Sequence, residues 1–107
     1  MLGDVHQSVA NILSNLAYVY SSQGRHHEAE CQYLEALIIM KRLPDEHPST
    51  ATYLDNLATL YAEQTDYKLA MSLYEQALEI RTRLLGESHP DTKSSANSLA
   101  AVKAKLL

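Results

Sequence analysis

A chain of 107 residues is long enough for one domain, and its net charge of −4 argues against the basic surface that nucleic-acid binding requires. No apolar run approaches the roughly 20 residues of a membrane-spanning helix, and the N-terminus lacks the basic and apolar segments of a secretory signal. Three Gly and three Pro provide few tight turns, which favours an all-helical fold. The single cysteine, Cys31, has no partner for an internal disulfide, so we expect a reducing, cytoplasmic setting.

The first predicted helix runs from Val5 to about Ser22, where apolar residues recur at helical spacing. Gly24 interrupts this pattern in a short turn. A second helix is predicted from His26 to about Leu43, and Pro44 helps to end it. The apolar stripe of this second helix consists of Ala29, Tyr33, Ala36, Leu37 and Met40.

Three further helices are predicted in the rest of the chain. Pro48 fits the first turn of a third helix, where its missing N–H costs nothing. The inner stripe of that helix is Leu54, Leu57, Ala58 and Tyr61. A fourth helix runs from Tyr67 to about Leu85 and ends at Gly86, which we predict to be a left-handed C-cap. Pro90 and Asp91 open a fifth helix, which lasts to the end of the chain.

These helices belong to a repeat. The segment Asn15–Tyr20 recurs as Asn56–Tyr61, and Tyr33–Leu37 recurs as Tyr74–Leu78 at the same internal distance. A unit of this kind cannot bury its apolar face alone, so it must stack on copies of itself. We therefore predict a single domain made of three units, of which the last has only its first helix. Their approximate bounds are 6–46, 47–88 and 89–107.

The linkers between units follow the same period. Leu43–His47 and Leu85–His89 stand in register, and Leu2–His6 aligns with both. Leu2 and Gly3 would then be the tail of a preceding helix, and we expect the chain to be an excerpt of a longer array. The alternative is a complete small protein with ragged ends. The recurring histidines are predicted to cap or pack the linkers; they are His6, His47 and His89.

The pattern Leu-Ala-x-x-Tyr, then Ala, then Tyr-x-x-Ala-Leu resembles the tetratricopeptide repeat. It is carried by Leu16, Ala17, Tyr20, Ala29, Tyr33 and Ala36, and again by Leu57, Ala58, Tyr61, Ala70, Tyr74 and Ala77. The period exceeds the usual 34 residues, and with the Leu-Gly-x-x-His-Pro linkers it is similar to the repeats of kinesin light chains. HEAT repeats share this period, but no feature of the sequence favours them over the family with the Leu-Ala-x-x-Tyr pattern. The resemblance implies an all-α solenoid of about two and a half helix-turn-helix units, with five antiparallel helices.

The resemblance also implies a concave groove lined by the first helix of each unit. Its positions in the first two units are Asn11, Ser14, Asn15, Tyr18, Ser22, Thr52, Asp55, Asn56, Thr59 and Glu63, and Ser94, Asn97 and Ser98 follow in the third. An Asn side chain both donates and accepts, so a row of them can hold the backbone of an extended peptide. The lack of Lys and Arg among these positions favours a basic or neutral ligand. The alternative is a solvated helix face that needs only to be polar.

We therefore predict a protein–protein interaction module, a scaffold or adaptor that binds a peptide segment of a partner, and not an enzyme. No nucleophile stands beside a base, no Gly-rich phosphate loop is present, and no cofactor is expected. One alternative is self-association through the exposed apolar sides of the terminal helices, to which Leu106 and Leu107 add. Another is a metal or redox module at His27 and Cys31, but no second pair of ligands is evident and no metal is predicted.

Overall fold

The computed structural model describes the backbone of residues 2–107 and the side chains from residue 5 onward. The elements in this part of the chain are five helices and no strand. The helices are α1 (Leu2–Ser22), α2 (His26–Lys41), α3 (Pro48–Glu63), α4 (Tyr67–Leu85) and α5 (Pro90–Lys105). The all-α prediction is therefore confirmed, as is its sequence of helical hairpins.

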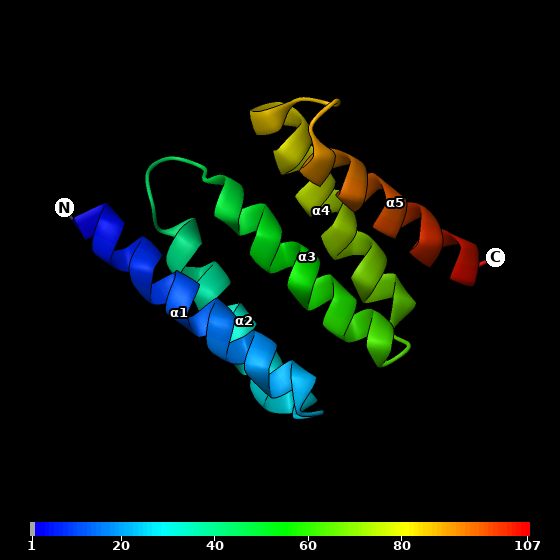
Figure 1. Cartoon of the computed structure of the whole chain (residues 1–107), viewed down its shortest axis with the longest axis horizontal. Helices are drawn as coiled ribbons and strands as arrows, with labels where there is room; N and C mark the ends of the chain where they lie inside the picture. Colours follow the sequence, from blue (N-terminus) through cyan, green and yellow to red (C-terminus); the bar gives the residue numbers. More distant parts are fainter. Residues whose placement is uncertain (1) are drawn as a thin grey trace.

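The helices are stacked in two layers. Helices α1, α3 and α5 lie alongside one another in one row, and α2 and α4 pack behind them (Figure 1). Within each hairpin α1 packs on α2 and α3 packs on α4, while α2 contacts α3 and α4 contacts α5 across the junctions between units. The molecule measures 46 × 34 × 19 Å along its principal axes. This flat stack leaves the outer side of the first-helix row free of other helices.

Alanines allow the helices to approach closely. Eight of them are fully buried: Ala10, Ala17, Ala29, Ala36, Ala51, Ala58, Ala70 and Ala77. Larger side chains, among them Tyr33, Tyr53 and Leu57, fill the space beside these small residues. Interdigitation of this kind is what sets the distance between packed helices. The predicted apolar stripe of α2 is buried along its whole length, which confirms the register of the repeat.

Two of the three linker histidines cap helices. The Nδ1 atom of His47 accepts a hydrogen bond from the Ser49 amide at 3.1 Å, and that of His89 accepts one from the Asp91 amide at 3.0 Å. Each cap satisfies one of the amide groups that the first turn of a helix leaves unpaired. The predicted capping role is confirmed at these two positions.

The first linker departs from the prediction. Helix α1 begins at Leu2, so the segment that aligns with the two linkers is helical, and His6 is exposed within it. The reason lies in the next residue, since Pro follows both His47 and His89 whereas Gln7 follows His6. Proline disfavours a helical conformation in the residue before it, and glutamine does not. The expected cap at His6 is therefore wrong.

Two helix ends also differ from the predictions. Helix α2 ends at Lys41, because the amides of Arg42 and Leu43 bond to carbonyls three residues earlier and tighten the chain into a turn. Gly86 has the expected positive φ, 88°, but its ψ is 160°. That combination is extended rather than left-handed helical and is open almost only to glycine. The prediction of a positive φ at Gly86 is confirmed, but the predicted left-handed helical conformation is wrong, because ψ is extended.

Candidate functional site

The predicted groove residues lie on the three helices of the first-helix row. Asn11, Asn15 and Tyr18 are exposed on α1, and the Tyr18 side chain is 64% exposed. Asn56 is half-buried on α3, while Asn97 is exposed on α5. Because residues three or four apart share one side of a helix, these positions form one polar stripe on each helix of the row.

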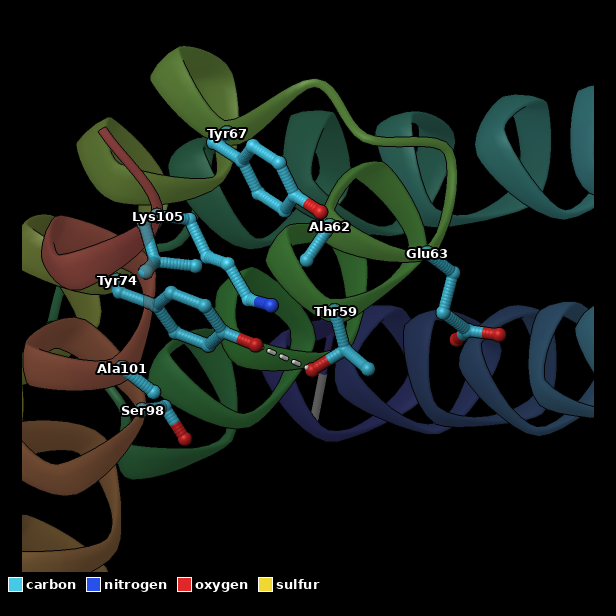
Figure 2. Close-up of a pocket in the computed structure, with 9 residues that line it drawn as sticks. Thr59, Ala62, Glu63, Tyr67, Tyr74, Ser98, Ala101 and Lys105 are labelled. Atoms are coloured by element: carbon cyan, nitrogen blue, oxygen red, sulfur yellow. Dashed lines mark hydrogen bonds between the residues drawn. The ribbon is translucent and has the colours of Figure 1, made fainter. Parts of the chain in front are cut away.

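A pocket of about 350 Å³ opens between α3, α4 and α5 (Figure 2). Its lining residues are Thr59, Ala62, Glu63, Tyr67, Tyr74, Ser98, Ala101, Val102 and Lys105. Thr59, Glu63 and Ser98 are predicted groove positions, so the pocket lies within the predicted face. Its walls are mainly the tyrosine rings together with alanine and valine side chains. It therefore offers an apolar space beside a polar helix stripe.

Tyr74 reaches this face from the second helix of its hairpin. Its hydroxyl lies 2.7 Å from Oγ1 of Thr59 (Figure 2). The Thr59 hydroxyl in turn donates to the backbone carbonyl of Asp55 at 3.0 Å. Since the Thr59 hydroxyl has one proton to donate, Tyr74 is the donor in the pair. Burial raises the pKa of Tyr74, and the bond to Thr59 opposes that rise. The phenol is thus held neutral, with its ring forming one wall of the pocket.

A buried ion pair fills the same junction near the start of α5. Arg81, 7% exposed, extends from α4, and its Nη1 atom donates to the Asp55 carboxylate, to Ser95 Oγ at 2.8 Å and to the Asp91 carbonyl at 3.2 Å. Its Nη2 atom donates to Thr52 Oγ1 at 3.3 Å. Ser95 also donates to the Asp55 carboxylate at 3.0 Å. Burial raises the pKa of Asp55, which the Arg81 charge and these hydrogen bonds oppose.

The ion pair changes the role of two predicted groove residues. Thr52 and Asp55 are hydrogen-bonded to Arg81, and the Asp55 side chain is only 15% exposed. Ser14, at the position equivalent to Asp55 in the first unit, is 4% exposed. This position faces the next unit rather than solvent. We therefore leave Ser14 and Asp55 out of the proposed binding surface and assign Thr52 to the junction.

The sequence prediction also missed two basic side chains near the face. Arg81 belongs to a second helix, and the prediction considered only first helices. Lys105 lines the pocket from α5. It occupies the position equivalent to Glu63 one unit later, so extending the groove pattern by one turn would have found it. The charge of the pocket is therefore mixed rather than acidic.

The other end of the face is polar. A hollow of about 290 Å³ is lined by Gln7, Ser8, Asn11 and Ser49 between α1 and α3. The Tyr53 hydroxyl donates to Oδ1 of Asn11 at 3.4 Å. The Gln7 amide nitrogen lies 3.0 Å from Nε2 of the capping histidine, His47. The first-helix row thus passes from amide groups at one end to an apolar pocket at the other.

The geometry gives the metal alternative no support. The Cys31 Sγ atom lies 4.0 Å from Nε2 of His27, and the nearest carboxylate, Glu30, lies 4.0 Å from the other ring nitrogen. Among the side chains that the structure describes, from residue 5 onward, no three His, Cys, Asp or Glu residues gather as a metal site would require. Glu30 instead accepts a hydrogen bond from the Tyr61 hydroxyl at 2.5 Å.

None of the described helices is long and apolar enough to cross a membrane.

Comparison with known proteins identifies the repeat. The family model described as tetratricopeptide repeat matches residues 8–83, which is more than two thirds of the chain. The chain belongs to the tetratricopeptide repeat family. Members of this family generally serve as protein–protein interaction scaffolds. The resemblance seen in the sequence is confirmed.

Two solved structures show the same stack of repeats. BtubC (BKLC) from P. vanneervenii is 26% identical, with a TM-score of 0.78 over 94% of this chain and 40% of its own. A variant of a Podosopora anserina protein, described as a kinesin light chain with nearly identical TPR-like repeats, is 28% identical, with a TM-score of 0.74 over 91% of this chain and 46% of its own. The chain therefore spans less than half of either protein. No curated protein matches it.

Proposed function

We propose that the row formed by α1, α3 and α5 binds an extended peptide segment of a partner protein, so that the chain acts as a scaffold or adaptor. The observation that carries this proposal is the apolar pocket between α3, α4 and α5, which lies beside Thr59, Glu63 and Ser98. Its volume of about 350 Å³ falls at the lower end of known ligand sites, which suits a single large side chain.

The polar stripe supports backbone recognition. Asn15 and Asn56 occupy equivalent positions in successive units, and each carries an amide donor and an amide acceptor. Such side chains pair with peptide groups whatever the residues of the peptide. Tyr18 lies on the same stripe and is largely exposed. Exposed tyrosines are frequent energetic centres of interfaces, because they bury a large area with little loss of side-chain freedom.

The charges near the pocket favour a neutral side chain at that point of the ligand. Asp55 is paired with Arg81, and Glu63 shares the pocket with Lys105. An apolar side chain inserted between the tyrosine rings would bury surface without leaving a charge unpaired. We further propose a cytoplasmic setting, because Cys31 is an exposed thiol that a reducing environment would preserve.

The test uses peptides selected from a random display library on the immobilised chain, with one selected peptide then titrated by fluorescence anisotropy. Ala101 lines the pocket, so Ala101→Met should fill it and abolish or strongly weaken binding. Ala96→Met is the matched control, because Ala96 is also exposed on α5 but is not part of the pocket. Asn15→Ala and Asn56→Ala should each weaken binding roughly 2- to 10-fold, the effect of one lost hydrogen bond.

The double variant Asn15→Ala/Asn56→Ala should bind more weakly than either single variant. Glu75→Ala, an exposed change on α4 outside the row, should have no effect. Equal affinity of the wild type, the double Asn variant and Ala101→Met would show that selected peptides bind elsewhere. That result, or a library without any enriched peptide, would contradict the proposal.

A further inference from the structure

The polar hollow between α1 and α3 has a side-chain amide in its wall whose oxygen is already in use. The hollow measures about 290 Å³, and Asn11 and Ser49 contribute to its lining. The Tyr53 hydroxyl donates to Oδ1 of Asn11 at 3.4 Å, and the Ser49 side chain hydrogen-bonds to the same hydroxyl. The NH2 group of Asn11 has no partner among the residues that the structure describes. Asn11 therefore offers the hollow a donor and no free acceptor.

The hydrogen bonds of His47 orient a second amide in the same way. Nδ1 of His47 accepts from the Ser49 amide, so the single proton of the neutral ring is on Nε2. The Gln7 amide lies against this Nε2 atom, at 3.0 Å. Since two donors do not bond to each other, a half-turn of the Gln7 amide presents its oxygen to the Nε2 proton. The NH2 group of Gln7 is then a second donor on the wall of the hollow.

A wall with two free NH2 groups selects a ligand group that accepts hydrogen bonds, either a carboxylate or a neutral carbonyl oxygen. The described residues that line the hollow carry no charge; they are Gln7, Ser8, Asn11 and Ser49. A carboxylate held there would lose hydration without a cation to pair with, and the net charge of −4 would repel it. A neutral amide oxygen is less costly to dehydrate, so the hollow favours an amide.

We propose that this hollow is a subsite of the peptide face and takes the carboxamide side chain of an Asn or Gln residue of the ligand. The inference rests on the proposed function and adds to it, because the hollow and the apolar pocket hold two side chains of one peptide. The ligand oxygen accepts from the NH2 groups of Gln7 and Asn11. The ligand NH2 group donates to the Ser49 hydroxyl oxygen, which keeps a lone pair for it.

The two subsites set the spacing of the ligand. On α3, Ser49 borders the hollow and Ala62 borders the apolar pocket, which places them roughly 20 Å apart along the helix. The hollow is on the α1 side of α3 and the pocket on the α5 side, so the ligand crosses α3 diagonally (Figure 1). At about 3.3 Å per residue, an extended peptide then carries the carboxamide about six or seven positions from its apolar residue. Asn56 lies near the middle of this path.

A double-mutant cycle between the chain and a library-selected peptide tests the subsite. The selected peptides should be enriched in Asn or Gln at this distance from a large apolar residue. For one peptide with Gln there, changing the peptide's glutamine to methionine and Asn11→Leu in the chain should each weaken binding roughly 3- to 10-fold. Both changes together should weaken it little more than one, because they remove the same hydrogen bonds. Asn97→Leu is the matched control, since Asn97 is exposed on α5 and does not line the hollow, and its effect should not depend on the glutamine.

The charge of the ligand group gives a second test. Changing the peptide's glutamine to glutamate should weaken binding about tenfold or more, because the hollow supplies no cation. A glutamate peptide that binds as tightly, fully additive effects of the glutamine and Asn11→Leu changes, or peptides without Asn or Gln enrichment would each overturn the subsite. If such peptides still lose affinity for Ala101→Met, the proposed function stands and only the subsite is refuted. Peptides that bind Ala101→Met and Asn11→Leu as tightly as the wild type would refute both.

Discussion

Thr65 and Gly24 occupy the same place in the two hairpin turns. Gly24 has a φ of 79°, and Thr65 has a φ of 63°. A positive φ costs glycine little, whereas it is strained for a β-branched residue, whose side chain crowds the backbone. The Thr65 hydroxyl donates to the carbonyl of Gln64 at 2.6 Å, which offsets part of that strain. The second turn is therefore the less relaxed of the two.

We expect Thr65→Gly to stabilise the protein by about 0.5–1 kcal/mol, since relief of about 1–2 kcal/mol of strain outweighs the added freedom of glycine in the unfolded chain. Urea unfolding followed by circular dichroism measures this change. The converse substitution, Gly24→Ala, should be destabilising even though no atom lies within 4 Å of the added carbon, because the backbone conformation alone is unfavourable. Lower stability of Thr65→Gly would show that the turn is not strained.

Tyr33 gives the protein a dependence on alkaline pH. Burial raises the pKa of its phenol to about 12, with smaller contributions from Tyr18 and Glu63. In the unfolded chain the phenol titrates near its ordinary pKa of 10.0, so between these values the folded state holds more protons than the unfolded state. The contribution of Tyr33 to stability is therefore complete below pH 10 and is lost as the pH rises towards 12.

The free energy of unfolding should accordingly fall as the pH rises through this window, and Tyr33→Phe should reduce the slope. The measurement is a series of urea titrations at increasing pH, with tyrosinate absorbance recorded in parallel. An unchanged slope in Tyr33→Phe would mean that another group accounts for the alkaline loss.

At the scale of helices, the two junctions between units solve the same packing problem with different residues. The first junction holds Ser14, Met40 and Tyr53, all buried. The second holds the equivalent residues Asp55, Arg81 and Ser95. Where Tyr53 is replaced by the small Ser95, the long side chain of Arg81 occupies the space. The carboxylate of Asp55 then balances the guanidinium charge that the exchange introduces.

Exchanging one junction for the other tests this equivalence. Asp55→Ser alone should cost about 3 kcal/mol or more, because it leaves the Arg81 charge buried and unpaired. The triple change Asp55→Ser/Arg81→Met/Ser95→Tyr reproduces the first junction and should recover most of that loss, since packed apolar residues commonly replace a buried ion pair without cost. Thermal unfolding measures both variants. A triple variant as unstable as Asp55→Ser would show that the two junctions are not interchangeable.

The repeat explains how much of this architecture was predictable. Leu57 and Ala77 lie at repeated positions, and repetition at helical spacing predicts burial because each unit must cover its neighbour. The start of α1 at Leu2 was not predicted, because residues 2–6 align with the two linkers. They are helical because Gln7 stands where the linkers have a proline. The contacts of Arg81 with α3 and α5 were not predictable either. They depend on the space that the small Ser95 side chain leaves between the helices.

The binding face shows the same limit. The exposed stripe of Asn15 and Tyr18 followed from the family resemblance and the helical period. The hydrogen bond between Tyr74 and Thr59 joins two helices that are adjacent only in the fold. The pocket that it borders arises where α3, α4 and α5 meet, and its shape depends on the helix packing. Sequence periodicity places residues on a face but does not reveal the space between helices.

At the scale of the whole molecule, two surfaces remain after the core is built. One is the first-helix row, which carries the polar stripe and the apolar pocket. The other is the exposed apolar side of α1, which carries Val9, Ile12 and Leu16. The pocket wall is continuous with the core, because Tyr74 and Val102 belong to both, whereas the exposed Asn15 and Tyr18 of the polar stripe lie outside the core. The central claim is that the first of these surfaces is where a peptide binds.

Nuclear magnetic resonance of the side-chain amide groups tests that claim most directly. Asn and Gln side chains give separate signals in a nitrogen–proton correlation spectrum, and the exposed Gln76 on α4 lies outside the row and serves as an internal control. On titration with a library-selected peptide, the amide signals of Asn15 and Asn56 should shift in proportion to binding while that of Gln76 stays in place. Shifts confined to Gln76, with Asn15 and Asn56 unaffected, would contradict the proposed peptide face.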